Sequence, residues 1–306
     1  MSVLGHRATP KPRITRRIVY NNLQGWAFAA PWIIGFLLFT IYPIGMSIYY
    51  SLTEYDVLRP PWFVGLLNYQ DLIKDILFWR ALQNTMFHVV FAVPLGMIVG
   101  LAVAMLLEKD IKGIAVYRTL YYLPSIVPMV ANLILWMWIL NPQYGILTNL
   151  VISLGGKSPG WLSDPRWAKP SIIMMTMWSA GSGMIIYLAG LKGIPRVYYE
   201  AAELDGANSV RRFFAVTLPM LSPTLFFQLI MGLISGFQIF TQAFIMTNGG
   251  PNDATMYYVY YLYNNAFRFW KMGYASALAW VLFAIIMLLT GLNFLISKYW
   301  VNYDQS

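Results

Sequence analysis

Six long stretches without Asp, Glu, Lys or Arg run through this 306-residue chain. Each exceeds the roughly 20 apolar residues that an α-helix needs to cross the hydrocarbon core of a bilayer. In a soluble domain of this size, charges would interrupt such runs to keep the surface hydrated. The stretches are Ile18–Thr53, Ala81–Leu107, Thr119–Gly156, Pro170–Leu191, Phe213–Asn252 and Met272–Ser297. The sequence therefore predicts an all-α integral membrane protein with six transmembrane helices.

The expected helices follow when polar, Pro and Gly residues are trimmed from the ends of these stretches. They lie near Trp26–Tyr50, Asn84–Leu107, Val116–Leu140, Ser171–Leu191, Met220–Met246 and Tyr274–Ser297. The segment Tyr257–Phe267 is too short to count as a further span. We expect a basic N-terminal segment over residues 1–23, a transmembrane domain over 24–300 and a tail over 301–306. The basic segment is either an amphipathic helix on the membrane surface or a disordered tail.

Basic residues in the loops predict the orientation, because short cytoplasmic loops are enriched in Lys and Arg. With six spans, both termini and the second and fourth loops share one side of the membrane. That side carries 13 of the 21 Lys and Arg residues, so we expect it to be cytoplasmic. The net charge of +9 is then a feature of membrane topology, and nucleic acid is not expected as a partner. The sequence predicts a multi-pass protein of the cell membrane with both termini in the cytoplasm.

The side chains offer little chemistry. Cysteine is absent and histidine occurs only at His6 and His88, which excludes thiol catalysis, disulfides, iron–sulfur clusters and an imidazole zinc site. Apart from Arg118 near the start of the third, the six expected helices carry no Asp, Glu, Lys or Arg, whereas ion-coupled transporters usually carry intramembrane ionisable groups. We interpret His88 as an interfacial or packing residue near a helix end. No enzymatic activity, metal or bound cofactor is expected for this chain, and the energy for any transport must come from another subunit.

The loop between the fourth and fifth expected spans, residues 194–219, carries the most specific pattern. Asp205-Gly206 interrupts a helical segment with a residue that is free to adopt positive φ. Asn208 or Ser209 can cap a second helix, which is expected to end before Pro219. The product is a short cytoplasmic helix–turn–helix, slim at its alanines, that could enter a groove on another protein. Its apolar anchors are Leu204, Val210, Phe213 and Phe214.

This loop resembles the signature loop of ABC-importer permeases, which reads Glu-Ala-Ala, three residues, Gly, nine residues, an aliphatic residue, one residue, Leu-Pro. The chain has Glu200-Ala201-Ala202, Gly206, Val216 and Leu218-Pro219 at these positions. Val216 in place of the usual Ile is a mild departure. Other stretches resemble the carbohydrate-uptake branch, the maltose and glycerol-phosphate type of permease. They are Tyr42-Pro43, Ser51-Leu52-Thr53, Ile194-Pro195, Tyr199, Asp205-Gly206-Ala207, Thr217-Leu218-Pro219, Asn248-Gly249-Gly250-Pro251, Ala266-Phe267 and Met272–Ala277.

The resemblance implies the type I ABC importer permease fold and a set of partners. The loop would dock on a cytoplasmic ABC ATPase, present in two copies, which would bind ATP and Mg. A second homologous permease and an extracellular or periplasmic solute-binding protein would complete the importer. The residues that the resemblance assigns to ATPase coupling are Glu200, Ala201, Ala202, Asp205, Gly206, Leu218 and Pro219.

Two helix faces are candidates for the substrate pathway, since residues three and four apart share one face of a helix. A Trp beside Ser hydroxyls suits a sugar, whose C–H faces stack on aromatic rings. The resemblance implies that these positions line a central cavity in maltose-type relatives. The faces consist of Met175, Trp178, Ser179 and Ser182 in the fourth span, and Gly232, Ser235, Gly236 and Ile239 in the fifth.

The two glycines of the fifth span are equally compatible with close packing of helices. The expected function is ATP-driven, binding-protein-dependent import of a sugar or oligosaccharide by alternating access. Two alternatives remain at this point. One is the same type of importer for glycerol-3-phosphate or another polyol-like solute, and the other is a secondary transporter.

Overall fold

The computed structural model describes residues 16–109, 111–179 and 181–302, without the side chains of 16–22 and 182. Most of the predicted basic segment 1–23 and of the tail 301–306 therefore lies outside the described residues. The chain divides into two units, residues 1–50 and 51–306, which are described separately. The first unit is a helical rod. It consists of Arg16–Phe36 (α1), a π-helical turn Leu37–Ile41 (η1) and Tyr42–Ser51 (α2).

The predicted span Trp26–Tyr50 lies within this rod, of which Leu23–Ser51 is long and apolar enough to cross a membrane. Proline lacks the backbone N–H that a helix interior uses, so a proline inside a helix removes one intrahelical hydrogen bond. Pro43 is the second residue of α2 and follows the end of the π-helical turn by two positions, where the bonding pattern still departs from that of an α-helix. The rod therefore continues to Ser51 in spite of this proline.

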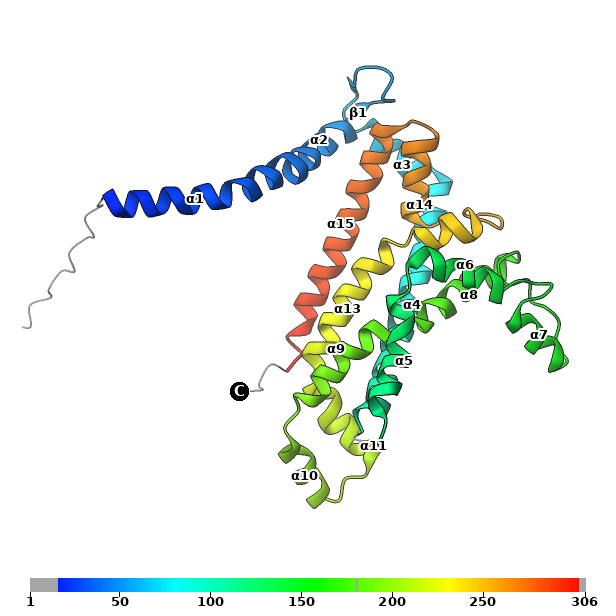
Figure 1. Cartoon of the computed structure of the whole chain (residues 1–306). Coiled ribbons are helices and arrows are strands. Elements are labelled where there is room, and N and C mark those ends of the chain that lie inside the picture. Colours follow the sequence, from blue (N-terminus) through cyan, green and yellow to red (C-terminus); the bar gives the residue numbers. More distant parts are fainter. Residues whose placement is uncertain (1–15, 110, 180, 303–306) are drawn as a thin grey trace, which may run out of the picture. The chain divides into compact units, whose positions relative to one another are not determined.

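The second unit is mainly helical (Figure 1). A short hairpin pairs β1 with β2 in antiparallel register, with Thr53 opposite Phe63. The elements are Thr53–Glu54 (β1), Trp62–Phe63 (β2), Leu67–Lys74 (α3), Ile76–Glu108 (α4), Ile114–Ile126 (α5), Met129–Ile139 (α6), Ile146–Ser153 (α7), Pro165–Trp178 (α8), Gly181–Lys192 (α9), Arg196–Leu204 (α10), Ser209–Arg212 (α11), Phe213–Thr217 (η2, π-helical), Leu218–Met220 (α12), Ser222–Phe237 (α13), Ala243–Thr247 (η3, π-helical), Tyr258–Tyr263 (α14), Asn264–Arg268 (η4, π-helical) and Met272–Ser297 (α15).

The second expected helix, near Asn84–Leu107, starts earlier in the structure. Helix α4 begins at Ile76 rather than at Asn84, because Asp75 caps it by accepting a hydrogen bond of 2.8 Å from the backbone N–H of Leu77. The first turns of α4 carry Arg80, a residue that belongs outside an apolar core. A helix can extend beyond the membrane, so the end of an uncharged run does not mark the end of the helix.

Three of the predicted spans are bent pairs of helices rather than single helices. Helices α5 and α6 meet at 97°, since Val127 between them has extended backbone dihedrals and is followed by Pro128. Helices α8 and α9 form a second bent pair, and the segment Ser209–Met220 forms a third with α13, which it meets at 67°. The predicted fifth helix ends at Phe237 rather than Met246. Within the described residues, three helices are long and apolar enough to span a membrane, or six if each bent pair counts as one span.

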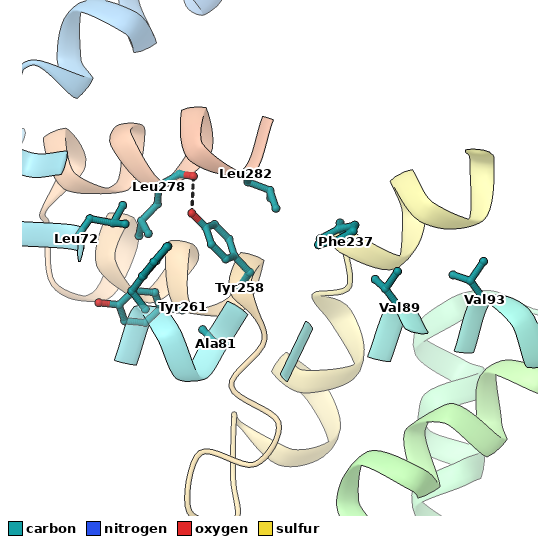
Figure 2. Packing of buried hydrophobic residues seen from close by; sticks show 10 residues of the cluster. Leu72, Ala81, Val89, Val93, Phe237, Tyr258, Tyr261, Leu278 and Leu282 are labelled. Carbon is teal, nitrogen blue, oxygen red and sulfur yellow. Dashed lines mark hydrogen bonds between the residues drawn. The ribbon is translucent and has the colours of Figure 1, made fainter. Parts of the chain in front are cut away.

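Helix α4 is the centre of the second unit and packs against α8, α9, α13 and α14 (Figure 1). Figure 2 shows Val89 and Val93 of α4 beside Phe237 at the end of α13. It also shows Tyr258 of α14, whose hydroxyl donates a 2.9 Å hydrogen bond to the carbonyl oxygen of Leu278 in α15. These contacts join α4, α13, α14 and α15 in one buried cluster.

A carboxylate at the start of α4 ties α4 to α14 and α15. Asp75 accepts hydrogen bonds from the hydroxyls of Tyr261 and Tyr274, the latter at 2.8 Å. Burial alone raises the pKa of the Asp75 carboxyl. The hydrogen bonds from the two tyrosines and from the backbone N–H groups of α4 outweigh burial and hold that pKa below its ordinary value. Asp75 is therefore a charged link between three elements at this end of the unit.

Candidate functional site

The loop between α9 and α13 forms the helix–turn–helix that the sequence predicts (Figure 1). Helix α10 ends at Leu204, and Gly206 follows with φ of 74°, which side chains other than glycine adopt at a cost. The side chain of Asn208 accepts a 2.9 Å hydrogen bond from the backbone N–H of Arg211 and so caps α11. The predicted glycine turn and the Asn208 cap are confirmed.

The predicted end of the second helix was wrong. Instead of stopping before Pro219, the chain passes from α11 through the π-helical turn η2 into α12, and bends only at Leu221. Pro219 lies in the first turn of α12, where its missing N–H is tolerated. Leu218 and Pro219, two of the predicted coupling residues, therefore belong to the stem that follows the loop.

Several contacts hold the base of the loop firmly against the helical bundle. The hydroxyls of Tyr199 and Thr217 lie 3.0 Å apart, and Arg212 forms an ion pair with Glu203 across the two arms of the loop. Ile194 is buried in a cluster with the last turns of α4, and Phe213 packs against that cluster. Because both arms are fixed at their base, the loop can move as one body with the bundle.

The tip of the loop exposes apolar side chains instead of burying them. Leu204 is 90% exposed, Val210 66% and Phe214 62%. The predicted coupling residues Glu200, Ala201, Asp205 and Gly206 are exposed, and Ala202 is partly buried. Of the four predicted apolar anchors, only Phe213 turns inward. A hollow of about 840 Å³ lies beside the loop, lined by residues that include Glu200, Glu203, Arg212 and, at the end of α4, Glu108 and the following Lys109.

A second candidate site is a cavity of about 640 Å³ among α4, α8, α9 and α13. Five of the eight predicted substrate-pathway residues line it: Ser179, Gly232, Ser235, Gly236 and Ile239. The cavity also has polar residues that the sequence reasoning did not select. They are His88, Thr176, Tyr187, Gln228, Gln238, Thr241 and Gln242. A cavity with this many hydroxyl, amide and imidazole groups suits a hydroxylated ligand.

His88 is the most informative of the lining residues. It lies well inside α4 rather than near a helix end, because α4 begins earlier than predicted. Its side chain is only 4% exposed, its ring is 5.5 Å from that of Tyr257, and its Nδ1 has no hydrogen-bond partner among the described residues. The buried Oε1 of Gln242 is unpaired in the same sense. Buried polar atoms are normally satisfied, so these two are open to a ligand or water.

The glycines of the fifth span also serve as packing positions. A Cβ added to Gly232 would come within 2.8 Å of Cγ1 of Val93, and one added to Gly236 within 3.1 Å of Cγ2 of Val89. Both glycines line the cavity as well, so the two interpretations of these residues are compatible. The absence of side chains brings α13 against α4 and leaves the cavity open beside them.

Of the remaining three candidates of the fourth span, Met175 and Trp178 do not line this cavity. Met175 is buried in a cluster with α6 and α7 residues. Trp178 is 62% exposed and lines a separate, mainly apolar hollow beside Tyr121. Ser182 lies in α9, and its side chain is outside those described. Ser179, which does line the cavity, accepts a 3.3 Å hydrogen bond from the amide of Asn132.

Residues 92–302 match the family model described as "Binding-protein-dependent transport system inner membrane component". The match covers more than half of the chain. The chain belongs to this family. It is therefore a multi-pass membrane permease of an ABC importer, as the loop motif predicted, and the secondary-transporter alternative is not favoured.

Individual relatives agree with this assignment. The probable ABC transporter permease protein YesP of Bacillus subtilis is 44% identical, and the alignment covers 95% of this chain and 96% of YesP. The lactose transport system permease protein LacF of Rhizobium radiobacter is 36% identical over 90% of this chain and 94% of LacF. A chain of a bacterial ABC transporter involved in the import of the acidic polysaccharide alginate has a TM-score of 0.79 at 22% identity, with 92% and 97% covered. This last similarity concerns the fold alone.

Proposed function

We propose that this permease imports a sugar or oligosaccharide as one of the two membrane subunits of an ATP-driven importer. The second subunit is a homologous permease, two copies of a cytoplasmic ATPase bind ATP and Mg, and a solute-binding protein delivers the substrate from outside. The chain itself catalyses no covalent chemistry. Each bent helix pair counts as one span, which gives six spans with both termini in the cytoplasm.

The observation that carries this proposal is the exposed apolar tip of the α10–α11 loop. The side chains of Leu204, Val210 and Phe214 are each more than 60% exposed. The α10–α11 loop that carries them is short and contains charged residues, so it is unlike a membrane-spanning segment. Apolar side chains on a rigid helix pair favour insertion into a groove of a partner protein. A partner that closes on ATP would push on this tip, and the fixed base would pass the motion to α4, α9 and α13.

The polar cavity supports a sugar as the cargo. Ser179, Ser235 and the unpaired groups of His88 and Gln242 offer hydrogen bonds to hydroxyl groups, while Ile239 and the glycines provide apolar surface. The relatives with named cargo agree. The lactose permease LacF is one, and a permease for sulfoquinovosyl glycerol from Agrobacterium fabrum is 33% identical. We assign the substrate pathway to this cavity, with Trp178 as an exposed neighbour of Ser179.

The coupling role can be tested by substituting Gly206. Its φ of 74° is incompatible with proline, whose ring fixes φ near −65°, so Gly206→Pro must reshape the tip of the loop. The importer would be reconstituted in proteoliposomes with its binding protein. We expect Gly206→Pro to insert normally but to lose uptake that depends on ATP hydrolysis.

Gly155→Pro is the matched control. Gly155 has φ of 80°, its surroundings are open like those of Gly206, and its N–H also bonds a carbonyl of the preceding helical turn. It lies in the predicted outward loop after α7, so this variant should retain coupled uptake. Normal coupled transport by Gly206→Pro, with normal ATPase assembly, would contradict the coupling assignment.

A further inference from the structure

The bend between the α10–α11 loop and α13 lies where a backbone hydrogen bond is missing. Pro223, the second residue of α13, has no N–H, so the carbonyl oxygen of Pro219 lacks the donor that a continuous helix would supply. The hydroxyl of Ser222 donates to this carbonyl oxygen instead, at 2.6 Å. Ser222 therefore links the two helices at the point where the segment Ser209–Met220 meets α13 at 67°.

The same hydroxyl also holds the residues that follow α15. The backbone N–H of Asn302 donates a hydrogen bond of 2.9 Å to Oγ of Ser222. A hydroxyl has one donor and two acceptor sites, so it can donate to Pro219 and accept from Asn302 at the same time. Ser222 is only 2% exposed, so water is kept away from both bonds. One buried hydroxyl thus connects the end of α12, the start of α13 and the segment after α15.

Residues 298–302, which we call the brace, have further contacts that hold them against α13. The N–H groups of Trp300 and Val301 donate to the carbonyl oxygen of Ser297 at 3.1 and 2.8 Å, which closes a turn after α15. The ring of Trp300 lies edge-on to the ring of Phe226 in α13, with 6.1 Å between their centres. Val301 is buried. The brace is therefore fixed in place by more than its bond to the hydroxyl.

The bend lies between the loop and the helix that lines the polar cavity. Leu221, at the bend itself, belongs to the buried cluster that includes Ile194 at the base of the loop. Beyond the bend, α13 lines the cavity with residues that include Gly232 and Ser235. If the two helices pivoted freely here, a push on the loop would change the angle of the bend instead of moving α13. A hydrogen bond from a third element opposes this pivot, because hydrogen bonds weaken steeply when they are stretched or misaligned.

We infer that the brace fixes the angle of this bend, so that a push on the α10–α11 loop displaces α13 and the cavity wall as one body. Ser222 and Asn302 are positioning residues in this account, because the bond between them ties the bend to the end of α15. The motion of the loop then reaches α13 and α15 together. This inference rests on the proposed function, since it describes how the loop acts on the cavity.

The test follows the bend with two spin labels in the complete importer in lipid nanodiscs. Cysteines replace the exposed Ala215 before the bend and the exposed Phe227 after it, and the chain has no other cysteine. Pulsed EPR gives the distance distribution between the labels, at rest and with the ATPase trapped by ATP and vanadate. With the brace intact, trapping should leave this distance unchanged. Asn302→Pro removes the N–H donor and Ser222→Ala removes the acceptor, so in either variant the distribution should broaden at rest and shift on trapping.

Each variant has a matched control. Asn302→Ala keeps the backbone N–H and should behave like the wild type. Ser297→Ala should do the same, because Ser297 is also buried and its hydroxyl also donates to a carbonyl oxygen three residues earlier, that of Phe294 at 2.8 Å, but within α15. The double variant Ser222→Ala/Asn302→Pro should match Ser222→Ala alone, since the donor has no effect once its acceptor is gone.

Two results would overturn the inference and leave the sugar importer intact. One is a wild-type distance distribution in both Asn302→Pro and Ser222→Ala, and the other is a shift on trapping in the wild type itself. Failure of the ATPase to assemble on the wild-type permease would instead overturn the proposed function.

Discussion

Leu204 offers a quantitative test of the docking surface. It is 90% exposed and belongs to none of the buried clusters, so Leu204→Ala should leave the stability of the permease unchanged. If the side chain is buried in a groove of the ATPase, its whole apolar surface contributes to association. Burying a leucine side chain contributes about 1.5–3 kcal/mol, of which alanine keeps a minor part. A loss of about 2 kcal/mol corresponds to binding that is about 30-fold weaker.

The assay would measure the affinity of the purified ATPase for the permease pair in nanodiscs by biolayer interferometry. Leu154→Ala is the control, because Leu154 is also 80% exposed but lies in the predicted outward loop after α7. It should bind the ATPase like the wild type. A wild-type dissociation constant for Leu204→Ala would refute the reasoning that the exposed tip is the contact surface.

Three further predictions concern the remaining features. The pKa of Asp75 is lower in the folded state than in the unfolded state, so its ionised form stabilises the fold above the unfolded pKa, and this effect is lost as the pH falls through the folded pKa. The melting temperatures of the wild type and Asp75→Asn should therefore differ at neutral pH and converge below the folded pKa. Gly232→Leu should destabilise the fold by about 1–3 kcal/mol, because the new side chain would overpack against Val93. Val93→Ala in the same protein should restore part of the stability in a denaturation experiment, and no recovery would count against this contact. Trp178→Ala should raise the substrate concentration for half-maximal uptake, and an unchanged value would remove Trp178 from the pathway.

The uncharged runs of the sequence predicted where long apolar helices lie but not the bends within them. An apolar run indicates that a segment lies in lipid, but it does not indicate where the helix within that segment bends. The bend before α6 had a local signal in Pro128, whereas the break after Phe237 is followed by Gln238, an ordinary helix former. The early start of α4 was not predicted, because Arg80 ends the uncharged run that was used to bound the helix. The signal that could have located it is Asp75, whose side chain caps the helix.

The α10–α11 loop was more predictable than the cavity. Its turn depends on Gly206 and Asn208, whose conformational preferences act locally and can be recognised in a sequence. The cavity residues come from several helices, and only their packing brings His88 beside Gln228 and Gln242. A search for any polar residue within an apolar run would have selected these three.

The most direct test of the central claim uses the absence of cysteine from the chain. A single cysteine at Leu204 would be labelled with a membrane-impermeant maleimide in oriented vesicles, with and without the ATPase. We predict labelling from the cytoplasmic side only, and protection when the ATPase is bound. Labelling from the outer side, or equal labelling with and without the ATPase, would contradict the proposal that this loop receives the work of ATP hydrolysis.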